Sequence, residues 1–303
     1  MHAAFIFTPF VFKELLELKP AVLKIFNTRE AYLLVAASMF IGLFVSLTFQ
    51  GMIAGMENTI LLDRIIVLVG ELAIVVPALL ILRQRQLKST DVLPLKAVSP
   101  LTVVMALVLV SGVIGLTSVF EILVLPYFPI PDFLTQLEAG LFDGSVLANL
   151  ILIIAAGFVA PIVEEYLFRG ILQQSLFYRY GSTLPAIVVP TVIFALFHVA
   201  YLFYLPALIE LIALAILLAW LMVKTANILI PIMVHGVFNL SSFTGLFIND
   251  SMEATTLSAL GLPWIIVSTI LFILGWVYYK NMNITLVEEV YLIPGPGEQT
   301  GHD

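Results

Sequence analysis

Three long apolar segments of this chain contain polar side chains whose types could do chemistry. These side chains are Glu164, Glu165 and Arg169 in the first segment, His198 in the second, and His235 and Asn239 in the third. An ionisable group inside hydrocarbon costs several kcal/mol, so it indicates by default a functional site that faces a protected cavity. Carboxyl and imidazole groups exchange protons with water and substrates. The residue types therefore predict acid–base chemistry carried out inside a bilayer.

The spacing within each segment indicates which of these side chains share a helical face. Glu165 and Arg169 are four residues apart with the acid first, which is the favourable order for a pair on one face. Glu164 points about 100° away around the helix and is free to face another element. Arg169 can neutralise one of the two repelling acids, which leaves the other available as a base. His235 and Asn239 are also four apart and share a face.

Composition places the chain among polytopic α-helical membrane proteins. Of its 303 residues, 61% are hydrophobic and 11% are charged, whereas a soluble domain has about 25% charged residues. The expected partner of such a surface is membrane lipid, and the net charge of −7 argues against nucleic acid. The chain has no cysteine, which excludes disulfides, thiolate metal sites and a cysteine nucleophile.

A membrane-spanning helix needs about 20 apolar residues, and the sequence contains eight candidates with prolines in or next to the gaps. They are Ala31–Gln50, Ile65–Leu82, Ser99–Phe120, Val146–Tyr178, Leu184–Tyr204, Ala207–Val223, Ile228–Ile248 and Pro263–Tyr279. The predicted fold class is all-α, with about eight transmembrane helices enclosing a catalytic cavity. The fourth candidate would reach about 48 Å as one helix, so it must tilt or project from the membrane.

The chain divides into three parts on this basis. Residues 1–30 mix apolar and charged side chains as a helix in the interface plane does, with a frayed tail as the alternative. Residues 31–280 form the eight-helix membrane domain, whose catalytic core is 146–248. Residues 281–303 form a tail that is expected to lie in the cytoplasm.

The basic residues indicate how the helices are oriented. With the N-terminus in the cytoplasm, Arg64 alone of the 13 Lys and Arg residues falls in an outer segment, and the other twelve fall in cytoplasmic segments. Cytoplasmic segments of membrane proteins carry an excess of Lys and Arg. The distribution therefore predicts an even number of spans with both termini cytoplasmic.

Three motifs, in their order along the chain, resemble those of the CAAX-protease and bacteriocin-processing family of intramembrane proteases: Glu164-Glu165-x-x-x-Arg169, Phe194-x-x-x-His198 and His235-x-x-x-Asn239. The resemblance covers roughly residues 146–248. It implies an eight-helix endopeptidase whose cavity opens to the cytosol. The implied substrate is a membrane-associated protein or peptide, prenylated in part of the family, and the implied location is the plasma membrane of a prokaryotic cell.

The resemblance also implies a role for each motif. By similarity, Glu164 with His198 would activate the attacking water, and His235 with Asn239 would stabilise the oxyanion. The acid and base that follow Glu164 would support the first motif. These roles agree with what peptide hydrolysis needs, which is a base for water and donors aimed at the developing oxyanion.

Several alternatives stay open at the level of the sequence. Glu164, His198 and His235 also match the one-Glu, two-His ligand set of a catalytic zinc, although no His-Glu-x-x-His helix is present, and metal-independent activation of water is favoured. The same fold could serve a non-catalytic bacteriocin-immunity or scaffold protein, or a transporter. A transporter would need a polar path through the first three spans, which offer only Glu71. Glu71 and Glu210 lie near span ends, so snorkelling or a local hydrogen bond is expected for both, with contact to the cavity as the less favoured alternative for Glu71.

Overall fold

The computed structural model describes residues 26–57, 59–136, 145–243 and 257–282. Within these residues the structure is helical and contains no β-strand, and Leu95 and Asn227 pair as an isolated antiparallel bridge. The predicted all-α class is confirmed. Most of the predicted interfacial segment 1–30 and of the tail 281–303 lies outside the described residues.

Six helical elements of the described chain are long and apolar enough to cross a membrane, and two apolar helices are shorter. The six are α2 (Thr28–Ile53), α3 (Ile60–Gln84), α4 (Pro100–Val124), the continuous element Val146–Tyr180, α10 (Leu205–Thr225) and the part Gly261–Asn281 of α12 (Leu257–Asn281). The two shorter helices are α9 (Thr183–Phe197) and α11 (Leu229–Ser241). Each of the eight predicted spans coincides with one of these elements, so the chain is a polytopic membrane protein.

Local signals in the sequence set several helix ends. The Asn27 side chain accepts a hydrogen bond from the Glu30 N–H (3.0 Å), and the Glu30 carboxylate accepts one from the Asn27 N–H (3.1 Å), so the two residues form a capping box for α2. Ser99 caps α4, and Pro100 occupies its first position. The element Val146–Tyr180 ends at Gly181, whose φ of 56° is a left-handed conformation that glycine adopts easily.

Two predicted spans are longer than the helices that form. α9 ends at Phe197 rather than at Tyr204, and a 3₁₀ turn at Val199–Phe203 (η5) follows. The physical reason is that the His198 imidazole bonds the Phe194 carbonyl, which a continuing helix would use for the backbone N–H of residue 198. α11 ends at Ser241, and the rest of the predicted span to Ile248 falls almost entirely outside the described residues.

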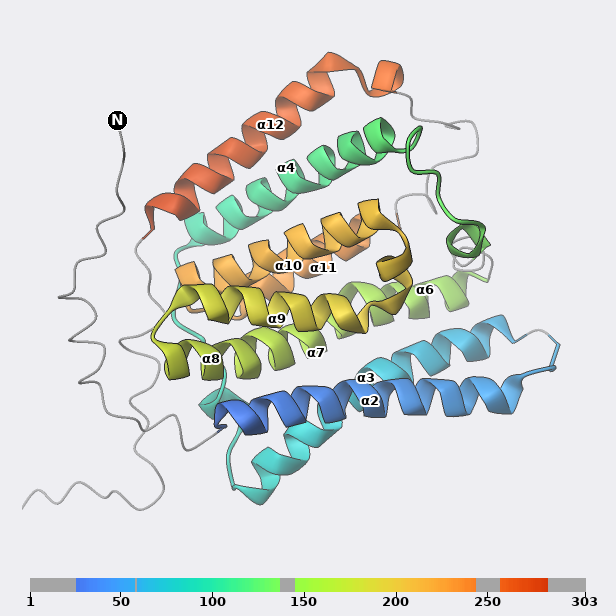
Figure 1. The fold of residues 1–303 in the computed structure, drawn as a ribbon, viewed down its shortest axis with the longest axis vertical. Coiled ribbons are helices and arrows are strands. Elements are labelled where there is room, and N and C mark those ends of the chain that lie inside the picture. The colour runs from blue at the N-terminus through green and yellow to red at the C-terminus, as the bar shows by residue number, and fades with distance from the viewer. Residues whose placement is uncertain (1–25, 58, 137–144, 244–256, 283–303) are drawn as a thin grey trace, which may run out of the picture.

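The helices form three layers (Figure 1). The hairpin of α2 and α3 packs on one side of a central layer, which contains Val146–Tyr180, α9, α10 and α11. α4 and α12 pack against each other on the other side. Two apolar cores fill the spaces between layers: Leu167 and Leu172 are fully buried in the first, and Leu109 and Leu218 in the second.

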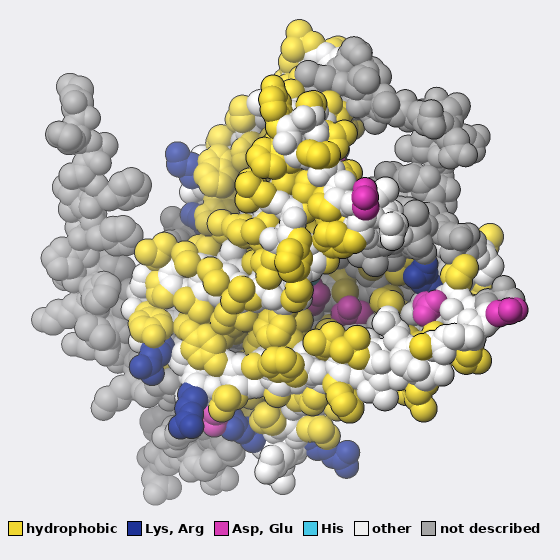
Figure 2. Space-filling model, turned by 45° about the vertical axis from the view of Figure 1, so that its right-hand side comes forward, with side chains coloured by type: hydrophobic (Ala, Val, Ile, Leu, Met, Phe, Trp, Pro, Cys, Tyr) yellow, Lys and Arg dark blue, Asp and Glu magenta, His cyan; other side chains and the backbone are white. Residues whose placement is uncertain are grey.

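The outer surface is apolar and the basic residues gather at one end. Figure 2 shows hydrophobic side chains over most of the visible face, and Phe44 on α2 is 70% exposed. Arg83 lies in the last turn of α3, Lys224 in that of α10 and Lys280 in that of α12. These helix ends lie on the same side of the molecule (Figure 1). This side is the one on which the sequence places the cytoplasmic segments.

Candidate active site

The element that carries the first motif is a 35-residue helix interrupted by two π-helical turns. The turns are η3 (Ala155–Val159) and η4 (Tyr166–Leu172), and the short α-helix α7 (Ala160–Glu165) lies between them with both acids in its last two positions. Two α-helical segments complete the element, α6 (Val146–Ile154) and α8 (Gln173–Tyr180). π-Turns inside α-helices are rare and occur frequently at functional sites.

Polar side chains bond backbone carbonyls in both π-turns, where the α-helical hydrogen-bond pattern is interrupted. The Asn239 amide donates from Nδ2 to the Ala156 carbonyl in η3 at 2.9 Å. The Gln174 amide donates from Nε2 to the Arg169 carbonyl in η4 at 2.9 Å. Because a buried carbonyl without a partner is costly, these bonds stabilise the shape of the element on both sides of the acid pair.

Glu165 is the most enclosed acid of the site. Its side chain is fully buried, and its Oε1 accepts hydrogen bonds from Nη1 of Arg169 and from Nδ1 of His235, both at 2.9 Å. Arg169 also donates from Nη2 to the Ala215 carbonyl of α10 at 3.1 Å, and its guanidinium lies 5.2 Å from the centre of the Phe194 ring. The predicted Glu165–Arg169 pair is therefore present. Glu165 connects it to α11, and Arg169 connects it to α10 and, through the Phe194 ring, to α9.

The bond to Glu165 fixes the orientation of His235. A carboxylate only accepts hydrogen bonds, so Nδ1 of His235 carries a hydrogen. Its other ring nitrogen, Nε2, lies 3.8 Å from Oε2 of Glu164. Both residues are buried, with His235 3% and Glu164 8% exposed. The side chain of Glu164 thus faces a ring nitrogen that is free to take part in proton transfer.

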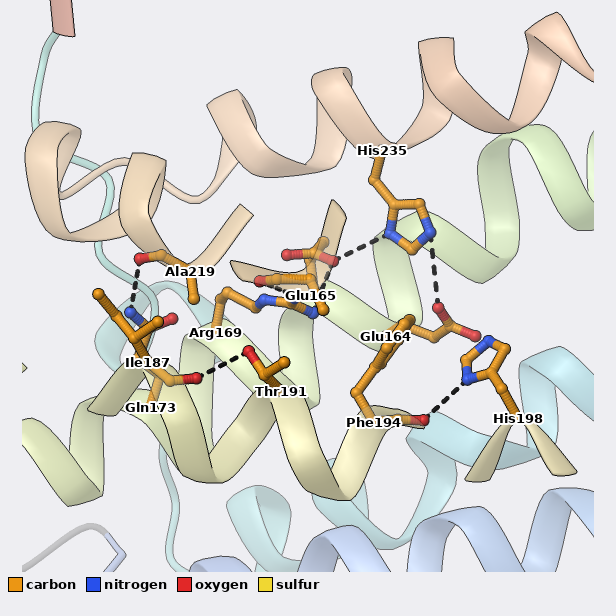
Figure 3. A network of polar contacts seen from close by, with 11 residues as sticks. Glu164, Glu165, Arg169, Gln173, Ile187, Thr191, Phe194, His198, Ala219 and His235 are labelled. Carbon is orange, nitrogen blue, oxygen red and sulfur yellow. Dashed lines mark hydrogen bonds and ion pairs between the residues drawn. The ribbon is translucent and has the colours of Figure 1, made fainter. Parts of the chain in front are cut away.

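His198 is held in the same way at the end of α9. Its Nδ1 donates to the Phe194 carbonyl at 2.8 Å, so Nε2 is the nitrogen left for chemistry. Its ring packs against the ring of Phe194 at 4.3 Å, and the Phe194 ring also lies 6.1 Å from that of His235. Figure 3 shows Glu164, His198 and His235 turned toward the same space from three different elements.

Residues 146–241 match the family described as Type II CAAX prenyl endopeptidase Rce1-like. This segment is an Rce1-like domain. It begins with α6 and ends with the last residue of α11, so all six predicted site residues lie inside it. The predicted family is confirmed for this segment, and the family is one of CAAX-type endopeptidases. No curated protein and no solved structure matches the chain.

The Rce1-like domain brings four of the six predicted residues into one chain of polar contacts, which runs from Arg169 through Glu165 and His235 to Glu164. His198 joins this group through the Phe194 ring. Asn239 lies one turn after His235 on α11 and is partly exposed, but its amide donates to the backbone of η3 rather than to the acids or histidines. The predicted role of Asn239 thus depends on the second N–H of its amide.

The residues of the Rce1-like domain do not fit a catalytic metal site. No group of three or more His, Cys, Asp or Glu side chains in the described part of the chain is arranged to hold a metal ion. A catalytic zinc takes three protein ligands and keeps one position open. Glu164, His198 and His235, the set that the sequence offers for zinc, therefore lack the required convergence, and no step below uses a metal.

Glu71 lies deeper in its span than the sequence indicates. α3 begins at Ile60, five residues before the predicted span, so Glu71 lies mid-helix rather than near an end where it could snorkel. α3 packs against η3 and α7, and α7 carries Glu164. The depth of an acid within its span is the signal that could have found it. Glu210 instead hydrogen-bonds Glu121 of α4, and a hydrogen bond is one of the two outcomes that the sequence leaves open for it.

Proposed function

We propose that this protein is an intramembrane endopeptidase that hydrolyses a peptide bond of a membrane-associated, CAAX-type protein or peptide with water activated at Glu164. The observation that carries the proposal is the Glu164 carboxyl, whose Oε2 lies 3.8 Å from Nε2 of His235, on a ring whose Nδ1 is committed to Glu165. His198 turns toward the same space (Figure 3) with its Nδ1 committed to the Phe194 carbonyl, so both rings have Nε2 left for chemistry. The Rce1-like match supports the class of reaction.

The proposed reaction begins with removal of a proton from water. Glu164, assisted by His198, takes this proton while the water oxygen attacks the scissile carbonyl carbon. The oxyanion that forms accepts hydrogen bonds from the Asn239 amide and from His235, whose Nε2 must carry a hydrogen at this step. The proton on Glu164 then passes to the leaving nitrogen as the C–N bond breaks. Glu165 takes no part in bond making, because its Oε1 holds Arg169 and orients His235.

The proposal includes the orientation in the membrane. The protein is placed in the plasma membrane of a prokaryotic cell with both termini in the cytoplasm. The support for this placement is the gathering of Arg83, Lys224 and Lys280 at one end of the helix bundle.

The first experiment compares purified wild type with Glu164→Gln and His198→Ala on a fluorogenic prenylated CAAX peptide and on bacteriocin-like precursors. Glu164→Gln keeps the size of the side chain and removes the base, so kcat is expected to fall by about 10²–10⁴-fold. Glu210→Gln is the matched control, because Glu210 is a membrane-embedded acid bonded to Glu121 outside the site. Its kcat is expected to equal that of wild type.

Two results would contradict the proposal. If wild type turns over none of these substrates while Glu164→Gln and wild type are equally functional in cells, the protein is a non-catalytic immunity or scaffold protein. Exhaustive chelation is expected to leave kcat unchanged. A loss of activity that zinc restores would contradict the metal-independent chemistry.

A further inference from the structure

His198 lies at the end of α9, where the regular helix gives way to η5, and its side chain is half-buried. Its Nδ1 donates to the Phe194 carbonyl at 2.8 Å. This bond fixes the position of one ring nitrogen but leaves the imidazole free to tilt about the bond. A catalytic group is held precisely only when packing and further contacts lock its rotamer. A second contact is therefore needed to set the plane of the His198 ring.

Two aromatic rings lie against the His198 imidazole. The centre of the Phe194 ring is 4.3 Å from the centre of the imidazole, and the two planes are tilted by 40°. The centre of the Tyr201 ring is 6.2 Å away, and its plane is inclined by only 17°. This is an offset parallel arrangement, one of those that aromatic pairs prefer. Because the planes of Tyr201 and His198 nearly agree, the Tyr201 contact depends directly on how the imidazole is tilted.

The backbone of η5 keeps Tyr201 beside His198. The Tyr201 N–H donates to the His198 carbonyl at 3.0 Å, and the Tyr204 N–H donates to the Tyr201 carbonyl at 3.2 Å. The ring of Tyr201 is therefore attached to a turn whose start is the histidine itself.

Residues 125–136, which follow α4, hold this turn from outside the Rce1-like domain. The Tyr204 hydroxyl donates to the Phe128 carbonyl at 3.1 Å. The Phe203 ring packs edge to face on the Phe133 ring, with 6.3 Å between their centres. Both ends of the contact between Tyr201 and His198 are thus supported, one by α9 and the other by these residues.

We propose that Tyr201 is a positioning residue that sets the plane of the His198 imidazole, so that its Nε2 stays turned toward the space that Glu164 faces. Tyr201 acts through His198, so the inference rests on the proposed function, in which His198 assists Glu164. It also gives residues 125–136 a part in the reaction, because they hold η5 in place.

The kinetic test compares Tyr201→Phe, which keeps the ring, with Tyr201→Leu, which removes it. Tyr201→Leu is expected to lower kcat by about 3- to 10-fold, the effect of one aromatic contact, and to leave KM unchanged. Tyr201→Phe should keep the kcat of wild type. Tyr127→Leu is the matched control, because Tyr127 is 80% exposed beyond the end of α4, and it should also keep the kcat of wild type.

Three kinetic results would overturn the role of Tyr201. The first is a wild-type kcat in Tyr201→Leu. The second is an equal loss in Tyr201→Leu and Tyr201→Phe, which would assign the effect to the hydroxyl group. The third is a raised KM as the main effect of Tyr201→Leu, which would make Tyr201 a residue that binds substrate.

A second measurement needs no substrate. The chain has four histidines, so isotope-labelled histidine gives four ring signals in a nuclear magnetic resonance spectrum, and that of His198 is the one lost in His198→Ala. A stacked aromatic ring displaces the signal of the imidazole beside it. Tyr201→Leu should therefore shift the His198 signal, whereas Tyr201→Phe and Tyr127→Leu should leave it in place. If Tyr201→Leu leaves this signal unmoved, the inference fails. If the signal moves as expected and wild type cleaves no peptide, it is the proposed function that fails.

Discussion

At the residue scale, the Glu165 carboxyl joins the two basic side chains of the site, and its complete burial determines what the loss of either would cost. Arg169→Met would leave an ionised Glu165 with His235 as its remaining bonded partner. Removing one member of a buried ion pair destabilises a protein by about 3–5 kcal/mol. We expect a decrease of this order in the free energy of unfolding, measured by unfolding in mild detergent.

Two controls separate the buried pair from a general effect of charge. Glu165→Gln combined with Arg169→Met removes both charges, so the double variant should be more stable than Arg169→Met alone. Arg179→Met removes an exposed cation from the same helical element and should change stability by less than about 0.5 kcal/mol. Equal losses in Arg169→Met and Arg179→Met would show that the buried pair contributes nothing specific.

Asn239 has one amide hydrogen committed to Ala156 and a second one available for the oxyanion. We expect Asn239→Ala to lower kcat by about 10²–10³-fold with little change in KM, which is the effect of removing one oxyanion donor. Ser241→Ala, two residues further along α11, is the control and should keep full kcat. If Asn239→Ala raises KM and leaves kcat intact, its amide binds substrate instead of stabilising the transition state.

The bonds within one helix could be predicted from the sequence, and those between helices could not. The Glu165–Arg169 bond follows from a spacing of four residues and the order of acid and base. The Glu165–His235 bond joins residues 70 positions apart, and no pattern within either segment specifies which acid the imidazole meets. For the same reason the sequence does not decide which side chains Glu71 meets, since that depends on how α3 packs against the Rce1-like domain.

At the element scale, α11 must approach η3 closely for His235 to reach Glu165. A Cβ on Gly236 would lie 2.9 Å from the Gly157 carbonyl oxygen, which belongs to the backbone and cannot rotate away. We expect Gly236→Ala to push α11 away from η3, lowering both kcat and the unfolding temperature. Gly51→Ala is the matched control, because a Cβ there meets nothing within 4 Å, and it should be neutral or slightly stabilising. Unchanged activity in Gly236→Ala would show that the helices do not need this approach.

The sequence predicts the number and order of the helices better than their ends. Eight apolar stretches of suitable length gave eight helical elements, because hydropathy and length are properties of each stretch alone. α9 ends early because the His198 imidazole bonds the Phe194 carbonyl in place of the backbone N–H of His198. Hydropathy carries no information about which of these two hydrogen bonds forms. A hydrophobic pattern with a period of 3.6 residues does not predict the π-turns on either side of the acids either.

At the scale of the whole molecule, His198 and Asn239 lie toward the end of the helix bundle that is opposite the basic end. α9 begins just after Arg179 and places His198 at its far end, and α11 begins after Lys224 and places Asn239 in its last turn. Figure 2, in which the right-hand side of Figure 1 comes forward, shows acidic side chains in a hollow of this part of the surface. If the basic end lies in the cytoplasm, this hollow faces the outer half of the membrane, whereas the family resemblance implies a cytosolic opening.

The absence of cysteine from the chain makes this orientation directly measurable, because a single introduced thiol is the only one that a reagent can find. We expect Phe203→Cys, at a 70% exposed position of η5 next to His198, to react with a membrane-impermeant maleimide in intact cells. Lys280→Cys, at the basic end of α12, should react only after the membrane is permeabilised. The wild-type chain is the control and should remain unlabelled. The reverse pattern would place the mouth of the site on the cytosolic side and show that the Lys and Arg distribution does not set the orientation of this protein.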